Sequence, residues 1–127
     1  MRIYLFGALL LSGACTQQPT AALDAAKPIH CMAAFNVAAV IGKQAGNSKL
    51  QGESIARALF ESEKLGSRRA LEAKAETARI AQDRLSQDGD ATQNLAVECA
   101  RKQDSDPTFE ARLPELLVKA QAWNPPT

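Results

Sequence analysis

The sequence predicts an all-α protein, a small helical bundle of four to five helices with one disulfide. Alanine is abundant, aromatic residues make up 5% of the chain and β-branched residues are scattered, which favours helices packed through small side chains over a sheet. Apolar residues recur at helical spacing from Pro28 onward. Cys31 and Cys99 fall on the apolar stripes of two different predicted helices.

The first helix is predicted from Pro28 to about Ala45, and Gly46 with Asn47 ends it. Proline suits a first helical turn because the N–H that it lacks would have no intrahelical partner there. Apolar residues cover most of the circumference of this segment, so we expect it to be the central and most buried helix. Its apolar stripes contain Ile29, Cys31, Met32, Ala33, Phe35, Val37, Ala38, Val40, Ile41 and Gly42.

A second helix is predicted to start where Ser48 and Gln51 resemble a capping box, and to fade near Gly66. Its inner face contains Ile55, Ala58 and Leu59. Ser67 can cap a third helix, or the two segments form one long helix kinked at Gly66, because a glycine costs about 1 kcal/mol relative to alanine without forbidding continuation. The expected inner seam of this third segment is Leu71, Ala75, Ala78 and Leu85. The residues expected to face solvent are Arg69, Glu72, Glu76, Arg79 and Arg84.

The turn Gln87–Gly89 precedes a fourth helix, which Asp90 with Gln93 is expected to cap and which ends near Lys102. Its inner stripe is Thr92, Leu95, Ala96 and Cys99.

A last short helix follows a break at residues 104–107 and is either continuous or split near Pro114. Its inner residues are Phe109, Leu113, Leu116, Leu117 and Ala120. Trp123 follows and is expected to cover the open end of the bundle, and residues 125–127 form a short tail.

A disulfide between Cys31 and Cys99 would close a loop of about 70 residues, for which chain entropy gives roughly 4 kcal/mol of stabilisation. A small domain has only about 5 to 15 kcal/mol of stability in all, so this bridge would be decisive. Two buried, unbonded thiols are the alternative, and they suit an oxidising compartment less well.

Residues 1–14 have the organisation of a secretory signal peptide. Met1 and Arg2 form a positive n-region, and the apolar stretch Ile3–Leu11 leads into the small residues Ser12–Ala14. This apolar stretch is far shorter than the roughly 20 residues that a helix needs to cross a hydrocarbon core. The sequence therefore predicts export of the remaining chain.

The segment Leu11–Cys15 resembles the bacterial lipoprotein signal, in which small residues precede a cysteine that is lipidated and becomes the mature N-terminus. That pattern has Leu, Val or Ile three residues before the cysteine, where this chain has Ser12. The resemblance covers about the first 16 residues. It implies lipidation of Cys15 and anchoring of the protein in a membrane of the bacterial cell envelope.

Ordinary signal peptidase cleavage remains an alternative, after Ala14 or after Ala22. Lipidation of Cys15 and cleavage after Ala22 both remove the third cysteine, which would otherwise be an unpaired thiol. We assign residues 15–27 to a flexible linker, because they are rich in Gln, Thr, Ala and Pro, and residues 28–124 to the helical domain.

Charge argues against a nucleic-acid partner. Arg2, one of the 15 basic residues, lies in the signal segment, which leaves 14 basic and 14 acidic side chains beyond it. Nucleic-acid-binding proteins show a basic excess gathered on one face. The charged run Glu61–Arg84 is typical of a solvated helix face. We expect i,i+4 ion pairs between Arg68 and Glu72 in this run and between Glu53 and Arg57 before it.

No motif for catalysis, metal or cofactor survives inspection. His30 directly precedes Cys31, but adjacent helical side chains point about 100° apart, so the pair reads as a surface histidine beside a structural cysteine. The sequence Asp88–Asp90 fails as a calcium loop, because Arg84 and Leu95 stand where carboxylates are required.

These observations predict an exported, non-enzymatic protein with no cofactor, whose helical domain binds a protein partner. A lipidated Cys15 would anchor it in the envelope; without the lipid it would be a soluble periplasmic or secreted helical protein. A carrier of a small ligand is the alternative, and it requires an apolar cavity of at least about 300 Å³.

Overall fold

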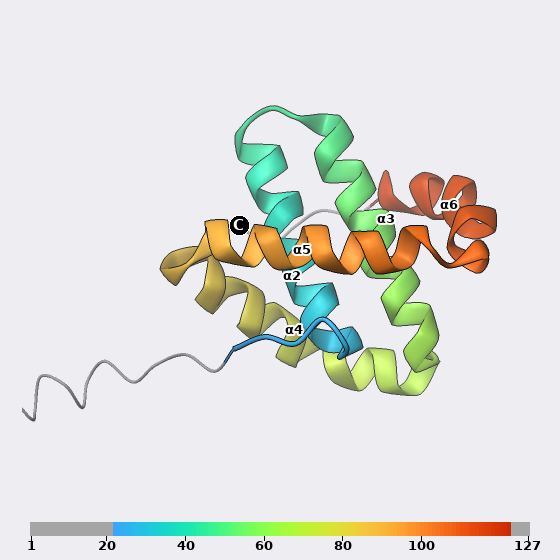
Figure 1. Cartoon of the computed structure of the whole chain (residues 1–127), viewed down its shortest axis with the longest axis horizontal. Helices are drawn as coiled ribbons and strands as arrows, with labels where there is room; N and C mark the ends of the chain where they lie inside the picture. Colours follow the sequence, from blue (N-terminus) through green and yellow to red (C-terminus); the bar gives the residue numbers. More distant parts are fainter. Residues whose placement is uncertain (1–21, 123–127) are drawn as a thin grey trace, which may run out of the picture.

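The computed structural model describes residues 22–122, in which five α-helices and no strand are found. The helices are α2 (Pro28–Gln44), α3 (Ser48–Leu65), α4 (Ser67–Gln87), α5 (Gly89–Asp104) and α6 (Pro107–Ala120) (Figure 1). The predictions of an all-α fold and of one disulfide are confirmed, and each helix begins and ends within a few residues of its predicted bounds. Residues 1–21 and 123–127, with the predicted signal, Cys15 and Trp123, lie outside the described residues.

Helix α2 lies at the centre, as predicted. It contacts α3, α4 and α5, and α6 packs against the outside of α3 (Figure 1). Its buried residues cover nearly the whole circumference: Cys31, Met32, Ala33, Ala34, Phe35, Val37, Ala38, Ala39 and Gly42. Small side chains on each side of α2 allow three neighbours to approach it closely, which is why a segment with few aromatic residues can form the core.

The disulfide joins the first turns of α2 to the middle of α5. Cys31 and Cys99 lie 5.8 Å apart at Cα and are 3% and 1% exposed. Around them lies a buried cluster of Ala34, Phe35, Ala38, Ala58 and Ala96. The bridge therefore fixes α5 on the central helix where the side chains that pack between them are mostly alanines.

Removal of the disulfide by the double substitution Cys31→Ala/Cys99→Ala should lower the free energy of unfolding by about 4 kcal/mol, because the 68-residue loop is then open in the unfolded chain. Urea unfolding followed by circular dichroism measures this loss. Reduction of the native protein should give a loss of the same size. A change below about 1 kcal/mol in both measurements would show that helix packing alone holds α5 in place.

Helices α2 and α3 meet at a tight corner that depends on Gly42. A Cβ atom at this position would lie 3.0 Å from the backbone nitrogen of Gln51 and 3.2 Å from the carbonyl oxygen of Asn47. The Asn47 side chain accepts a hydrogen bond from the Leu50 N–H at 3.0 Å and caps α3. Glycine at position 42 therefore lets the start of α3 lie directly on the end of α2.

The substitution Gly42→Ala should lower the free energy of unfolding by about 1 to 3 kcal/mol, because the added methyl group meets backbone atoms that cannot move aside. Gly52→Ala is the matched control: it lies inside α3 with nothing within 4 Å of its Cβ position, and it should raise stability by about 0.5 to 1 kcal/mol. Thermal and urea unfolding of both variants give the comparison. Stabilisation by both substitutions would contradict the close approach at the corner.

Three predicted helix caps are corrected, and two alternatives that the sequence left open are decided. Asn47, not Ser48, caps α3, and neither Ser67 nor Asp90 is an N-cap, because α4 and α5 follow Gly66 and Asp88 without a side-chain cap. At Gly66 the backbone φ of 82° ends α3, so α3 and α4 are two helices and not one kinked helix. Helix α6 runs unbroken through Pro114.

The predicted inner seam of α4 is wrong in its first half, at Leu71 and Ala75, whereas Ala78 is half-buried and Leu85 packs against the core. Leu71 is 73% exposed and Ala75 is exposed, whereas Arg84, which was expected to face solvent, is 7% exposed. The buried face consists of Ala73, Thr77, Ile80, Ala81 and Arg84. This face can lie close to Ala33 and Val37 of α2 because two of its residues are alanines, and the Arg84 guanidinium is paired with Asp88 at 2.9 Å.

Helix α6 is attached to α3 by an aromatic contact and an ion pair. The rings of Phe60 and Phe109 meet edge to face with centroids 5.1 Å apart. Arg112 donates two hydrogen bonds to Glu63, at 3.1 and 2.5 Å, and this bonding lowers the pKa of the Glu63 carboxyl below its ordinary value. The apolar contact and the charged pair together hold the last helix on the outside of the bundle.

The folded body begins before α2. Leu23 packs against the cluster formed by Ala33, Val37, Ile80 and Ala81, and Ala25 packs against the cluster around the disulfide, so part of the predicted linker 15–27 lies against the helices. No helix among residues 22–122 has the length and apolar character needed to cross a membrane.

Candidate functional site

A groove lies between α3 and α5, with α2 as its floor. Its volume is about 380 Å³. It is lined by Phe35, Ala38, Leu50, Glu53, Ser54, Arg57, Gln93, Asn94, Ala96, Val97 and Ala100. We refer to this feature as the α3/α5 groove. It exists because α3 and α5 each pack on α2 far more than on each other.

The floor of the α3/α5 groove is apolar and its rim is polar. Phe35, Ala38 and Ala96 are buried along the floor, and the alanines among them leave space that larger side chains would fill. Val97 lies at the rim with 54% of its surface exposed, although it is a large apolar residue. An apolar floor with a few polar groups at the edge is the usual composition of a binding site.

Arg57 closes one end of the groove and connects α3 to the end of α5. Its guanidinium donates to Asp104 at 3.0 Å and to the carbonyl oxygen of Ala100 at 3.3 Å, and it lies 4.8 Å from the centre of the Phe109 ring. The side chain is 15% exposed. Arg57 therefore has partners on α5 and α6 and acts as a fixed wall of the groove.

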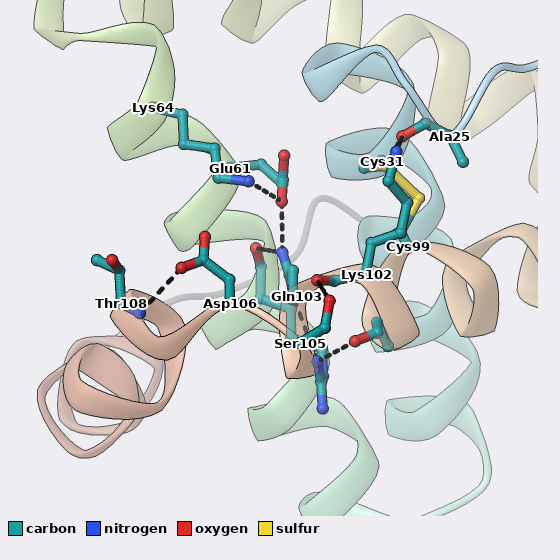
Figure 2. A network of polar contacts seen from close by, with 12 residues as sticks. Ala25, Cys31, Glu61, Lys64, Cys99, Lys102, Gln103, Ser105, Asp106 and Thr108 are labelled. Atoms are coloured by element: carbon teal, nitrogen blue, oxygen red, sulfur yellow. Dashed lines mark hydrogen bonds and ion pairs between the residues drawn. A yellow bond between two sulfur atoms is a disulfide. The ribbon is translucent and has the colours of Figure 1, made fainter.

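Behind Arg57 lies a buried polar contact between Gln103 and Glu61 (Figure 2). Gln103, 2% exposed, donates from Nε2 to the Glu61 carboxylate at 2.6 Å and to the Arg57 carbonyl at 3.1 Å. Its Oε1 accepts from Arg57 at 3.2 Å. Glu61 is 5% exposed and also pairs with Lys64 at 3.4 Å. A single glutamine thus supplies hydrogen-bond partners to both Arg57 and Glu61 of α3.

The substitution Gln103→Leu should lower the free energy of unfolding by about 1 to 3 kcal/mol, because it keeps the volume but removes a hydrogen bond from a buried carboxylate. Gln82→Leu, at an exposed position of α4, is the matched control and should change stability by less than about 0.5 kcal/mol. Urea unfolding of the two variants measures the difference. Equal effects would show that the Gln103 contacts contribute nothing to stability.

Glu53 lies on the rim of the α3/α5 groove without an ion-pair partner among the described residues. The predicted Glu53–Arg57 pair is wrong, because Arg57 turns to Asp104 on the neighbouring helix. The predicted Arg68–Glu72 pair is confirmed, at 3.7 Å on the exposed face of α4. The groove therefore presents an acidic side chain beside an apolar floor.

The candidate residues from the sequence are distributed over separate parts of the fold. Cys31 and Cys99 meet in the disulfide, and His30 lies half-buried at the start of α2, where its Nδ1 accepts a hydrogen bond from the Asp24 N–H at 2.8 Å. Among residues 22–122 no three His, Cys, Asp or Glu side chains gather closely enough to hold a metal ion. The lining of the groove combines apolar side chains with polar ones, and so offers contacts for binding.

The Arg57–Gln103–Glu61 contacts are not among the interactions predicted from the sequence. A signal was present, since Gln103 follows Cys99 by four residues and therefore continues the predicted inner stripe of α5. A polar residue on such a stripe indicates a partner in the core. The partners themselves lie 42 and 46 residues away in the chain, which helical spacing does not reveal.

Comparisons of the chain with protein-family models, with curated proteins and with solved structures found no match in any of the three. Inferences about function therefore depend on the residues and the geometry of this chain.

Proposed function

We propose that the protein is an exported bacterial envelope lipoprotein, anchored through Cys15, whose helical domain binds a protein partner in the α3/α5 groove. The signal-like segment 1–14 and the small residues before Cys15 support export and lipidation. The Cys31–Cys99 disulfide supports the same location, because such bonds persist in oxidising compartments such as the periplasm.

The α3/α5 groove is the observation on which the binding proposal depends. Its volume of about 380 Å³ accommodates a few apolar side chains, and Val97 extends the apolar surface onto the rim. Glu53 at the edge is complementary to a basic residue. The partner that fits is therefore a protein segment that inserts apolar side chains over the floor and places a Lys or Arg beside Glu53.

Intact mass spectrometry of protein isolated from its native membrane tests the anchor. The expected mass corresponds to cleavage before Cys15, with added acyl chains at this residue, and to two hydrogens fewer than the thiol form for the Cys31–Cys99 bond. Cys15→Ser should release the protein from the membrane fraction, since the lipid chains supply the attachment. A mass that corresponds to cleavage after Ala22 would refute the lipoprotein proposal.

Photo-crosslinking from position 94, on the groove rim, tests the partner. In the native envelope a defined crosslinked product is expected, and Val97→Lys should reduce its yield at least about tenfold by placing a like charge against the basic partner. Val118→Lys is the matched control, because Val118 is 66% exposed on α6, away from the groove, and it should leave the yield unchanged. Equal yields in the two variants would contradict binding in the groove.

The groove volume of about 380 Å³ also lies within the range of small-molecule sites, although the groove is open and partly polar and not an enclosed apolar cavity. In a small-ligand carrier, the second candidate function, the ligand is a small apolar molecule, and native mass spectrometry of the envelope protein should show it bound. Val97→Lys would then remove the bound molecule while no protein crosslink forms in the wild type.

A further inference from the structure

The chain before α2 is held on the helices by a short set of specific contacts. We call residues 22–27 the arm. Within it, the Asp24 carboxylate accepts a hydrogen bond from the Ala26 N–H at 2.9 Å, and the Lys27 N–H donates to the Asp24 carbonyl at 3.0 Å. The Asp24 N–H in turn donates to Nδ1 of His30 at 2.8 Å. These bonds give the arm one turn and attach this turn to the start of α2.

Two further contacts hold the arm to its neighbours. Leu23 packs with α2 and α4, and the Lys102 ammonium of α5 donates to the Ala25 carbonyl at 3.2 Å. The same carbonyl oxygen lies 3.2 Å from Sγ of Cys31 (Figure 2). Ala25 also packs against the cluster that contains Cys31 and Cys99. The arm therefore lies over the disulfide, which has only 3% and 1% of its two residues exposed.

We propose that the arm is a pH-sensitive cover over the Cys31–Cys99 disulfide, which opens when His30 gains a proton. The hydrogen bond from Asp24 requires a lone pair on Nδ1, and only the neutral imidazole has one. In the protonated ring Nδ1 carries a hydrogen, so two N–H groups would face each other at 2.8 Å. Protonation of Nδ1 and the closed position of the arm therefore exclude each other.

The charges around His30 act in both directions. From the arm itself, Asp24 favours the charged imidazole and Lys27 opposes it; from α4, Glu76 favours it and Arg84 opposes it. Arg79 and Asp83 of α4 line the same hollow. Burial is the largest influence, Lys27 adds to it, and together they lower the pKa of His30 below its ordinary value of 6.5.

The sign of the effect follows from this lowered pKa. Well above pH 6.5 the imidazole is neutral whether the arm is closed or open, so the closed arm has its full stability. Below 6.5 the ring of the open arm takes up a proton more readily than the ring of the closed arm. The ratio of open to closed arm then rises by up to about tenfold per pH unit, until the pH falls below the pKa of the closed state.

Opening of the arm changes the chemistry of the disulfide. A reducing nucleophile must reach a sulfur atom to break the bond. In the closed state the Ala25 carbonyl lies against the sulfur atom of Cys31. A water-soluble phosphine serves as the probe: it attacks one sulfur, and with one water molecule it becomes the phosphine oxide while both sulfurs become thiols. We expect this reaction to be faster at acidic pH relative to a small, exposed reference disulfide.

The experiment uses the folded protein with its native N-terminus, at pH 7.5 and pH 5.0. The phosphine reduction rate, divided by that of the reference disulfide, should rise at least about fivefold in the wild type at the lower pH. The variant His30→Asn keeps an acceptor oxygen near the position of Nδ1 but does not titrate, and its ratio should change by less than about twofold. Hydrogen exchange of the Asp24 amide, corrected for its intrinsic rate, should follow the same pattern.

Lys102→Met provides the second variant, since it removes the α5 contact to Ala25 without touching His30. It should speed reduction at both pH values if the arm covers the sulfurs. Equal acceleration by acid in the wild type and in His30→Asn would overturn the proposal, because the opening would then not depend on this imidazole. If Lys102→Met leaves the reduction rate unchanged, and the relative rate of the wild type is the same at both pH values, the arm does not shield the disulfide from reduction.

Discussion

The structure depends on the contact of one alanine-rich helix with three neighbours at once. Helix α2 is buried on nearly every side, yet it contributes few large side chains, so each neighbour must approach closely to bury enough apolar surface. At such short distances even a small displacement of a neighbouring helix would lose contacts with α2. Gly42 at the α2/α3 corner and the disulfide to α5 fix two of these neighbours directly. The covalent bond acts where the side chains between α2 and α5 are mostly alanines.

The elements of the fold follow from the sequence where apolar spacing is strong and continuous. The stripes of α2 and the pair Cys31–Cys99 could be placed correctly because nearly every inward position is apolar. Helix α4 could not be placed in the same way. Its apolar residues are mostly alanines, which occur on exposed and buried faces alike, so Leu71, a large residue that proves to be exposed, misled the assignment. The aliphatic part of Arg84 took an inward position.

The candidate site could not be predicted from local sequence patterns, for a different reason. The α3/α5 groove is the space between two helices that pack on a third, and its walls come from segments about 40 residues apart. Glu53 and Arg57 do not form the predicted pair within α3, because the Arg57 guanidinium binds Asp104 and Gln103 of the neighbouring helix α5. This exchange of partners also leaves the carboxylate of Glu53 on the groove rim.

The position of the arm limits how far the helical domain can lie from an anchor at Cys15. Because Leu23 already belongs to the folded body, only about seven residues separate it from Cys15. Fully extended, such a stretch spans roughly 25 Å, close to the diameter of a domain of this size. In the proposed lipoprotein the attached end of the domain would therefore stay within about one domain diameter of the bilayer surface, and its far end within about two. A partner would then have to meet the domain within this distance of the bilayer surface.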